Sequence, residues 1–133
     1  MSAFVDTNVL IRHLTGDPPK MATRASAFLA TETELLLADL VVAETVYVLE
    51  SLYETPRPQI SRAVRSLLAL GSVVCVDPPL LRRAVEVYET ERLDFAEAYL
   101  VASAESTGMN RIASFDRSID RVGSVERIEP RDA

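Results

Sequence analysis

Five acidic residues of this 133-residue chain stand where carboxylates could do chemistry. Asp6 ends a short apolar run near the N-terminus, and Asp116 follows another apolar run late in the chain. Asp94 and Glu97 open a helical pattern, and Glu44 interrupts an apolar one. Sites in open parallel sheets form outside the carboxyl ends of the strands. We therefore predict that Asp6, Glu44, Glu97 and Asp116 converge at one sheet edge, with Asp94 as an accessory.

Each of these acids also has a purely structural interpretation. Asp6 and Asp116 could each cap a helix that begins just after them. The pair Asp94 and Glu97 has the spacing of a capping box, in which the second acid reaches back to the first residue's backbone. Glu44 lies among valines, an expensive place for a charge without a partner. The argument for function is the expected convergence of all of them.

Carboxylates held close together raise one another's pKa, and a divalent cation relieves that repulsion. Oxygen ligands without His or Cys suit Mg²⁺ or Mn²⁺. The chain has one histidine, His13, and one cysteine, Cys75, and neither stands beside the acids in sequence. A bound Mg²⁺ or Mn²⁺ activates water and stabilises a leaving oxygen. The residues thus predict metal-assisted phosphoryl chemistry.

Other common sites are missing from the sequence. It contains neither GxxxxGK[ST] nor GxGxxG, which argues against a P-loop and a dinucleotide site. With 20 acidic and 14 basic residues the formal charge is −6, unlike a passive nucleic-acid binder. A nuclease stays possible, because a metal reverses the local sign of an acidic site.

Composition predicts a globular protein in a reducing compartment, which we take to be the cytoplasm. Hydrophobic residues make up 48% and charged residues 26% of the chain, which excludes disorder. A single cysteine allows no disulfide within the chain. The N-terminus lacks the pattern of a signal peptide. The most apolar stretch is interrupted by Asp39, Glu44 and Glu50, so no membrane segment is predicted.

Strand and helix patterns alternate along the chain, which is typical of a parallel sheet covered on both sides. Asp39 is expected to cap the helix over 40–53, and Asp94 is expected to cap the helix over 95–107. The predicted strands are 3–6, 34–38, 73–76, 111–114 and 124–128. The predicted helical segments are 8–14, 19–31, 40–53, 60–68, 81–88 and 95–107.

Four segments, FVDTNVLIRHL, LVVAETVYVLE, LDFAEAYLVASAE and IASFDR, resemble the PIN-domain ribonucleases. They look most like the VapC toxins of type II toxin–antitoxin modules. The resemblance spans nearly the whole chain. It implies a three-layer α/β/α PIN domain with a short, mainly parallel central sheet, formed by residues 1–133 as a single domain. It also implies a Mg²⁺- or Mn²⁺-dependent ribonuclease.

The resemblance assigns the acidic residues to roles. Asp6, Glu44 and Asp116 match the first, second and fourth acids of the family, which are catalytic and bind the metal. The third acid usually ends a D-x-x-D-A pattern, and here Glu97 stands in its place while Asp94 matches the acid before it. Thr7, Asn8 and Ser114 match small polar positions that support the site, so together with Asp94 they are expected to be accessory residues.

The family further implies an RNA substrate, a homodimer and a VapB-type antitoxin whose tail covers an apolar groove. Candidate walls of that groove are the helix with Ile60, Val64, Leu67 and Leu68 and the helix with Val9, Leu10 and Leu14, although packing in the core is the default interpretation of each. One alternative is a non-catalytic interaction module with the PIN fold. Another is a phosphorylation receiver domain, which would need paired acids after the first strand and a late lysine; the chain has only Lys20.

Overall fold

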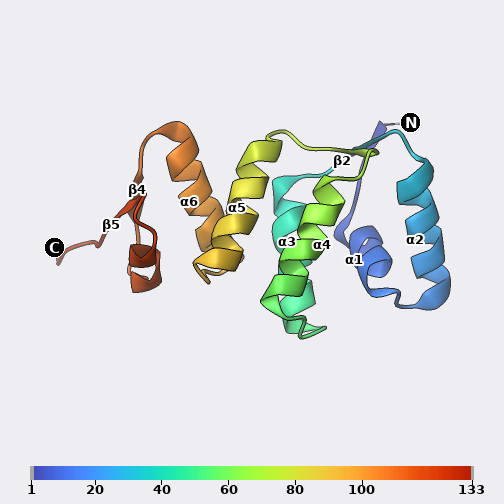
Figure 1. Ribbon diagram of the computed structural model, residues 1–133, viewed down its shortest axis with the longest axis horizontal. Helices are drawn as coiled ribbons and strands as arrows, with labels where there is room; N and C mark the ends of the chain where they lie inside the picture. Colours follow the sequence, from blue (N-terminus) through green and yellow to red (C-terminus); the bar gives the residue numbers. More distant parts are fainter. Residues whose placement is uncertain (1, 133) are drawn as a thin grey trace. The chain divides into compact units, whose positions relative to one another are not determined.

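The computed structural model describes residues 2–132 and contains two compact units, the first ending at Pro78 and the second beginning at Pro79. Figure 1 follows the elements in chain order. The first unit contains β1 (Ser2–Phe4), α1 (Thr7–Thr15), α2 (Pro19–Thr31), β2 (Glu34–Leu36), α3 (Asp39–Ser51), α4 (Arg57–Leu68) and β3 (Val73–Val74).

A three-stranded parallel sheet organises the first unit. Its strand order is β1-β2-β3, so β2 lies in the middle. Ala3 of β1 lies opposite Leu35 of β2, which in turn lies opposite Val73 of β3. Leu35 is completely buried, as expected for the central strand of a parallel sheet. The carboxyl ends of β1 and β2 both lead directly into helices, α1 and α3.

The helices of the first unit follow from local signals in the sequence. α1 begins at an Asp6 cap and ends at Gly16, whose φ of 72° is in the left-handed region that glycine tolerates. It packs against both α2 and α3. α4 buries the stripe of Ile60, Val64 and Leu67, which are at most 1% exposed. That stripe is core, so it does not form the wall of an open groove as we had considered from the sequence.

The second unit is built from two helices and a pair of strands. It contains α5 (Pro78–Thr90), α6 (Phe95–Thr107), β4 (Arg111–Ala113), the short 3₁₀ helix η1 (Arg117–Arg121) and β5 (Glu126–Ile128). β4 and β5 run parallel, with Ile112 opposite Arg127. α6 begins at the Asp94 cap and ends at Gly108, with a φ of 74°, as its sequence predicts.

A bidentate ion pair joins α5 to α6. The guanidinium of Arg83 donates from Nε and Nη2 to the two carboxylate oxygens of Glu105, at 2.7 and 2.9 Å. The hydroxyl of Ser124 donates to the same carboxylate, which brings in the loop before β5. At the turn between the helices, the rings of Tyr88 and Phe95 meet edge to face with centroids 5.9 Å apart. The helices of this unit are therefore fixed to each other by both polar and apolar contacts.

The predicted order of strands and helices is confirmed, and two local features differ. The strands are shorter than predicted, because residue pairing in the first sheet ends at Phe4, Leu36 and Val74. Asp39 does not cap α3: Ala38 is the cap residue, and Asp39 is an acid in the first turn, where its charge still suits the helix dipole. Within residues 2–132, none of the helices has the length and apolar character needed to cross a membrane.

Candidate active site

Asp6 and Glu44 are connected through Thr7 in the first unit. Asp6 is the cap residue of α1, and its Oδ1 accepts a hydrogen bond of 2.8 Å from the backbone N–H of Thr7. The side chain of Thr7 is buried and donates from Oγ1 to Oε1 of Glu44. Thr7 is the first residue of α1 and directly follows Asp6. It therefore orients the Glu44 carboxylate from a position next to Asp6 in the chain.

Glu44 is exposed, which corrects the expectation that it lies on an apolar face. Glu44 does not belong to the buried face of α3, which consists of Val42, Thr45, Val46 and Leu49. The hydroxyl of Thr7 gives its carboxylate a partner without the cost of burying a charge. The side chain of Asn8, another predicted accessory, is exposed one residue further along α1.

Three predicted acids meet in the second unit. Asp94 caps α6, where its Oδ1 accepts a hydrogen bond of 2.9 Å from the backbone N–H of Glu97. The carboxyl group of Glu97 lies close enough to those of Asp116 and Asp94 for both to raise its pKa. Asp116 follows β4 and caps η1. Asp94 and Asp116 therefore serve as helix caps, and both also lie near the Glu97 carboxyl group.

The pKa values of Glu97 and Asp116 shift in opposite directions. Partial burial raises the pKa of Glu97 to about 7, and the hydrogen bond and negative charge of Asp116 and the charge of Asp94 act in the same direction. The pKa of Asp116 falls to about 2, first because the Ser118 hydroxyl donates to it and then because protonated Glu97 does. Below about pH 7 the pair therefore holds one proton, which lies on Glu97.

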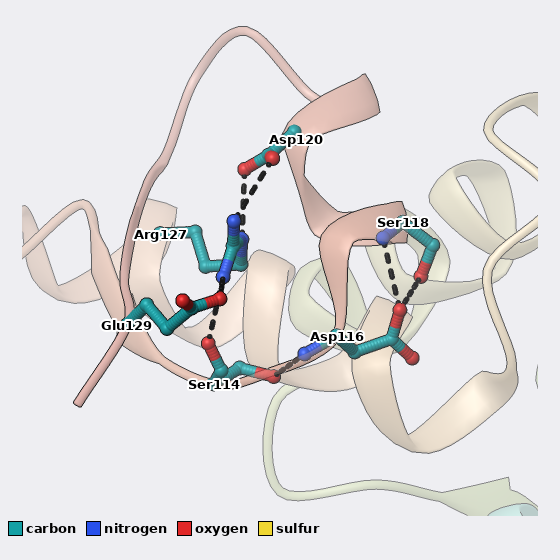
Figure 2. A network of polar contacts seen from close by, with 6 residues as sticks. All are labelled: Ser114, Asp116, Ser118, Asp120, Arg127 and Glu129. Atoms are coloured by element: carbon teal, nitrogen blue, oxygen red, sulfur yellow. Dashed lines mark hydrogen bonds and ion pairs between the residues drawn. The ribbon is translucent and has the colours of Figure 1, made fainter. Parts of the chain in front are cut away.

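Short hydrogen bonds shape the loop that carries Asp116 (Figure 2). Oδ1 of Asp116 accepts from the backbone N–H of Ser118 at 2.9 Å and from its hydroxyl at 2.7 Å. The backbone N–H of Asp116 donates to Oγ of Ser114 at 2.9 Å, so Ser114 contacts the loop that carries Asp116. Ser118 was missed in the sequence, although Asp-x-Ser is the spacing at which a cap residue meets such a donor.

The donor chemistry fits a divalent cation. All candidate ligands are carboxylates, and a cation near Glu97 and Asp116 would offset the repulsion between their negative charges. Within residues 2–132, neither unit by itself gathers three or more His, Cys, Asp or Glu side chains into a metal-holding group. Each unit supplies one part of the predicted set, and convergence of the two parts stays a prediction.

The raised pKa of Glu97 predicts how the stability of the metal-free protein depends on pH. Because Glu97 has a folded-state pKa of about 7, above its ordinary value of 4.5, its contribution to stability is fully present below pH 4.5. That contribution is lost as the pH rises through about 7. Asp116 acts in the opposite sense, but only as the pH falls through about 2. We expect Glu97→Gln, which cannot ionise, to lose less stability than wild type between pH 5 and 8.

Thermal unfolding in EDTA at several pH values checks this prediction. The Glu126→Gln variant is a matched control, because it removes one carboxylate that is exposed on β5. It should follow the wild-type profile. Parallel profiles for wild type and Glu97→Gln would show that Glu97 is ionised throughout.

Comparisons with known proteins identify a family and similar solved structures. A model of the PIN domain matches residues 3–125, a stretch that includes residues of both units. No curated protein sequence shows significant similarity to the chain. The crystal structure of VapC20 from Mycobacterium tuberculosis, described as a sarcin–ricin loop cleaving toxin, shares 22% identity with a TM-score of 0.38. That alignment covers 92% of this chain and 95% of the other. The family match confirms the predicted fold class, and the chain belongs to the PIN domain family.

Proposed function

We propose that this protein is a Mg²⁺- or Mn²⁺-dependent ribonuclease of the VapC type, which hydrolyses RNA phosphodiester bonds. The observation that carries the proposal is the proximity of the Glu97 and Asp116 carboxyl groups, which come from separate elements and have pKa values shifted in opposite directions. Such clustered acids with divergent pKa values are typical of functional sites. Membership of the PIN family and the match of Asp6, Glu44 and Asp116 to its acidic motif support the same function.

The proposed ligands are Asp6, Glu44, Glu97 and Asp116. A metal held by them would lower the pKa of a water molecule and stabilise negative charge on the phosphate. Thr7 and Asp94 position two of the proposed ligands. Thr7 fixes the orientation of Glu44 by its hydroxyl. Asp94 fixes the first turn of α6, so Glu97 starts from a defined backbone position.

Cleavage of RNA in the presence and absence of metal tests the proposal. Purified protein should cleave structured RNA when Mg²⁺ or Mn²⁺ is added as the only variable. EDTA should abolish cleavage, because the carboxylates alone cannot activate water. Restoring Mn²⁺ should restore cleavage. DNA of the same sequence is the control substrate. A folded protein that cleaves no RNA with either metal would favour the non-catalytic interaction module.

We also propose that the protein is the toxin of a VapBC-type pair, acting as a homodimer that a VapB-type antitoxin inhibits. α1 and α2 form an open cavity of about 380 Å³ that an antitoxin segment could fill. Its lining combines apolar side chains with two arginines: Val9, Arg12, Met21, Arg24, Ala25 and Phe28. Val9 is the predicted wall residue that lines it, whereas Leu10 is completely buried.

Growth of the native host tests the toxin assignment. Expression of this chain without its partner should arrest growth, because an active ribonuclease depletes essential RNA. Co-expression of the small reading frame beside its gene should restore growth, and size-exclusion chromatography should then show a complex. Normal growth with abundant folded wild-type protein and no partner would contradict the toxin assignment.

A further inference from the structure

Arg127 joins β5 to the segment around Asp116 (Figure 2). Its guanidinium donates from Nε and Nη2 to the two oxygens of Asp120, at 3.0 and 3.2 Å. Nη1 donates to the backbone carbonyl of Ser114 at 3.0 Å and to Glu129 at 2.9 Å. The Arg127 side chain is only 12% exposed, whereas that of Asp120 is 54% exposed. All three nitrogens of the guanidinium are therefore used within this unit.

The groups that Arg127 binds lie on either side of Asp116 in the chain. Ser114 precedes Asp116 by two residues and also accepts its backbone N–H through Oγ. Asp120 lies within η1, the helix that Asp116 caps. Arg127 therefore connects both ends of residues 114–120 to the same strand. Asp116 itself is exposed, so its own side chain is not held by surrounding core.

We infer that Arg127 is a positioning residue, which holds the Asp116 carboxylate where the proposed metal-dependent reaction needs it. This inference rests on the proposed function. Arg127 makes no contact with the Asp116 side chain and acts through the backbone of Ser114 and through η1. Residues that orient ligands in this way commonly affect metal affinity nearly as much as ligands do.

The geometry indicates that the shape of the guanidinium matters more than its charge. Two carboxylates, those of Asp120 and Glu129, already neutralise the positive charge of Arg127. A lysine would keep that charge, but its single nitrogen cannot span the Ser114 carbonyl and both oxygens of Asp120. Arg127→Lys should therefore behave like Arg127→Met. A role for charge alone would instead let lysine replace arginine.

The matched control is Arg111→Met in the neighbouring strand β4. Arg111 pairs with Glu126 at 3.6 Å, and its side chain is 63% exposed, so the substitution removes an arginine and an ion pair from the same sheet. It leaves the Asp116 loop untouched. A change seen with Arg127→Met and not with Arg111→Met is then specific to that loop.

Three measurements compare wild type, Arg127→Met, Arg127→Lys and Arg111→Met. In metal-free protein, the backbone amides of Asp116 and Ser118 should exchange with solvent at least about 10-fold faster in both Arg127 variants, because a charge-assisted hydrogen bond restrains the loop. Affinity for Mn²⁺, measured by electron paramagnetic resonance, should fall about 10- to 100-fold. The kcat for RNA cleavage should fall with it, while KM for RNA stays near that of wild type.

The outcomes separate this inference from the proposed function. Wild-type exchange and Mn²⁺ affinity in Arg127→Met would overturn the inference, and so would full recovery of both in Arg127→Lys. If Arg127→Met does not fold, Asp120→Asn weakens the same fork, and unchanged exchange and Mn²⁺ affinity in that variant would equally overturn it. If wild type cleaves no RNA, the proposed function fails, whereas exchange and Mn²⁺ affinity still decide the role of Arg127.

Discussion

Asp6→Asn should lower the rate of RNA cleavage by about 10²-fold or more, because a metal ligand supplies several kcal/mol of charge stabilisation in the transition state. The substitution is well suited to this position. Asp6 caps α1 by accepting the N–H of Thr7 through Oδ1, and asparagine caps helices as well as aspartate does. The variant should therefore fold like wild type while lacking the negative charge.

Asp17→Asn is the matched control for Asp6→Asn. Asp17 is an exposed acid after α1, where its carboxylate accepts a hydrogen bond of 3.3 Å from the hydroxyl of Tyr53. The control changes the net charge by the same amount in the same unit and should keep wild-type cleavage. Initial rates at saturating Mn²⁺, together with melting temperatures, compare the variants. Full activity in Asp6→Asn would leave its carboxylate with a structural role only.

The order of elements was predictable because most of their ends are encoded locally. Gly16 and Gly108 adopt the left-handed conformation that ends α1 and α6, and Asp94 caps α6 at the predicted residue. Asp39 was wrongly predicted to be the cap of α3. The cap, Ala38, is distinguished from the first helical residue by its extended backbone conformation, which the residue types do not reveal. Strand lengths were overestimated because apolar runs continue past the last paired residue.

The site was predictable at the level of residue types and less so at the level of contacts. Carboxylates after strands are visible in the sequence, and in the structure Glu97 lies near Asp116, while convergence of the full set stays a prediction. The bond from Thr7 to Glu44 links residues 37 positions apart, so only the packing of α1 on α3 reveals it. Arg127 gave no signal for the same reason, since its partners Ser114 and Asp120 are brought to it by the pairing of β4 with β5.

Glu97 should tolerate shortening of its side chain far better than loss of its charge. Glu97→Gln should lower the cleavage rate by about 10²-fold, because an amide cannot replace a carboxylate ligand. Glu97→Asp should keep or raise the rate, because aspartate retains the charge and matches the acid that the family pattern has at this position. Rates at saturating Mn²⁺ and the Mn²⁺ concentration giving half-maximal rate are the measurements.

Stability distinguishes this role from that of a capping residue. The cap of α6 uses the backbone N–H of Glu97, so the bond to Asp94 survives either substitution. Both variants should therefore stay within about 1 kcal/mol of the wild-type free energy of unfolding. Glu126→Gln on β5 controls for the loss of one exposed carboxylate. Equal cleavage rates per folded molecule in wild type, Glu97→Asp and Glu97→Gln would show that the contact with Asp116 serves structure alone.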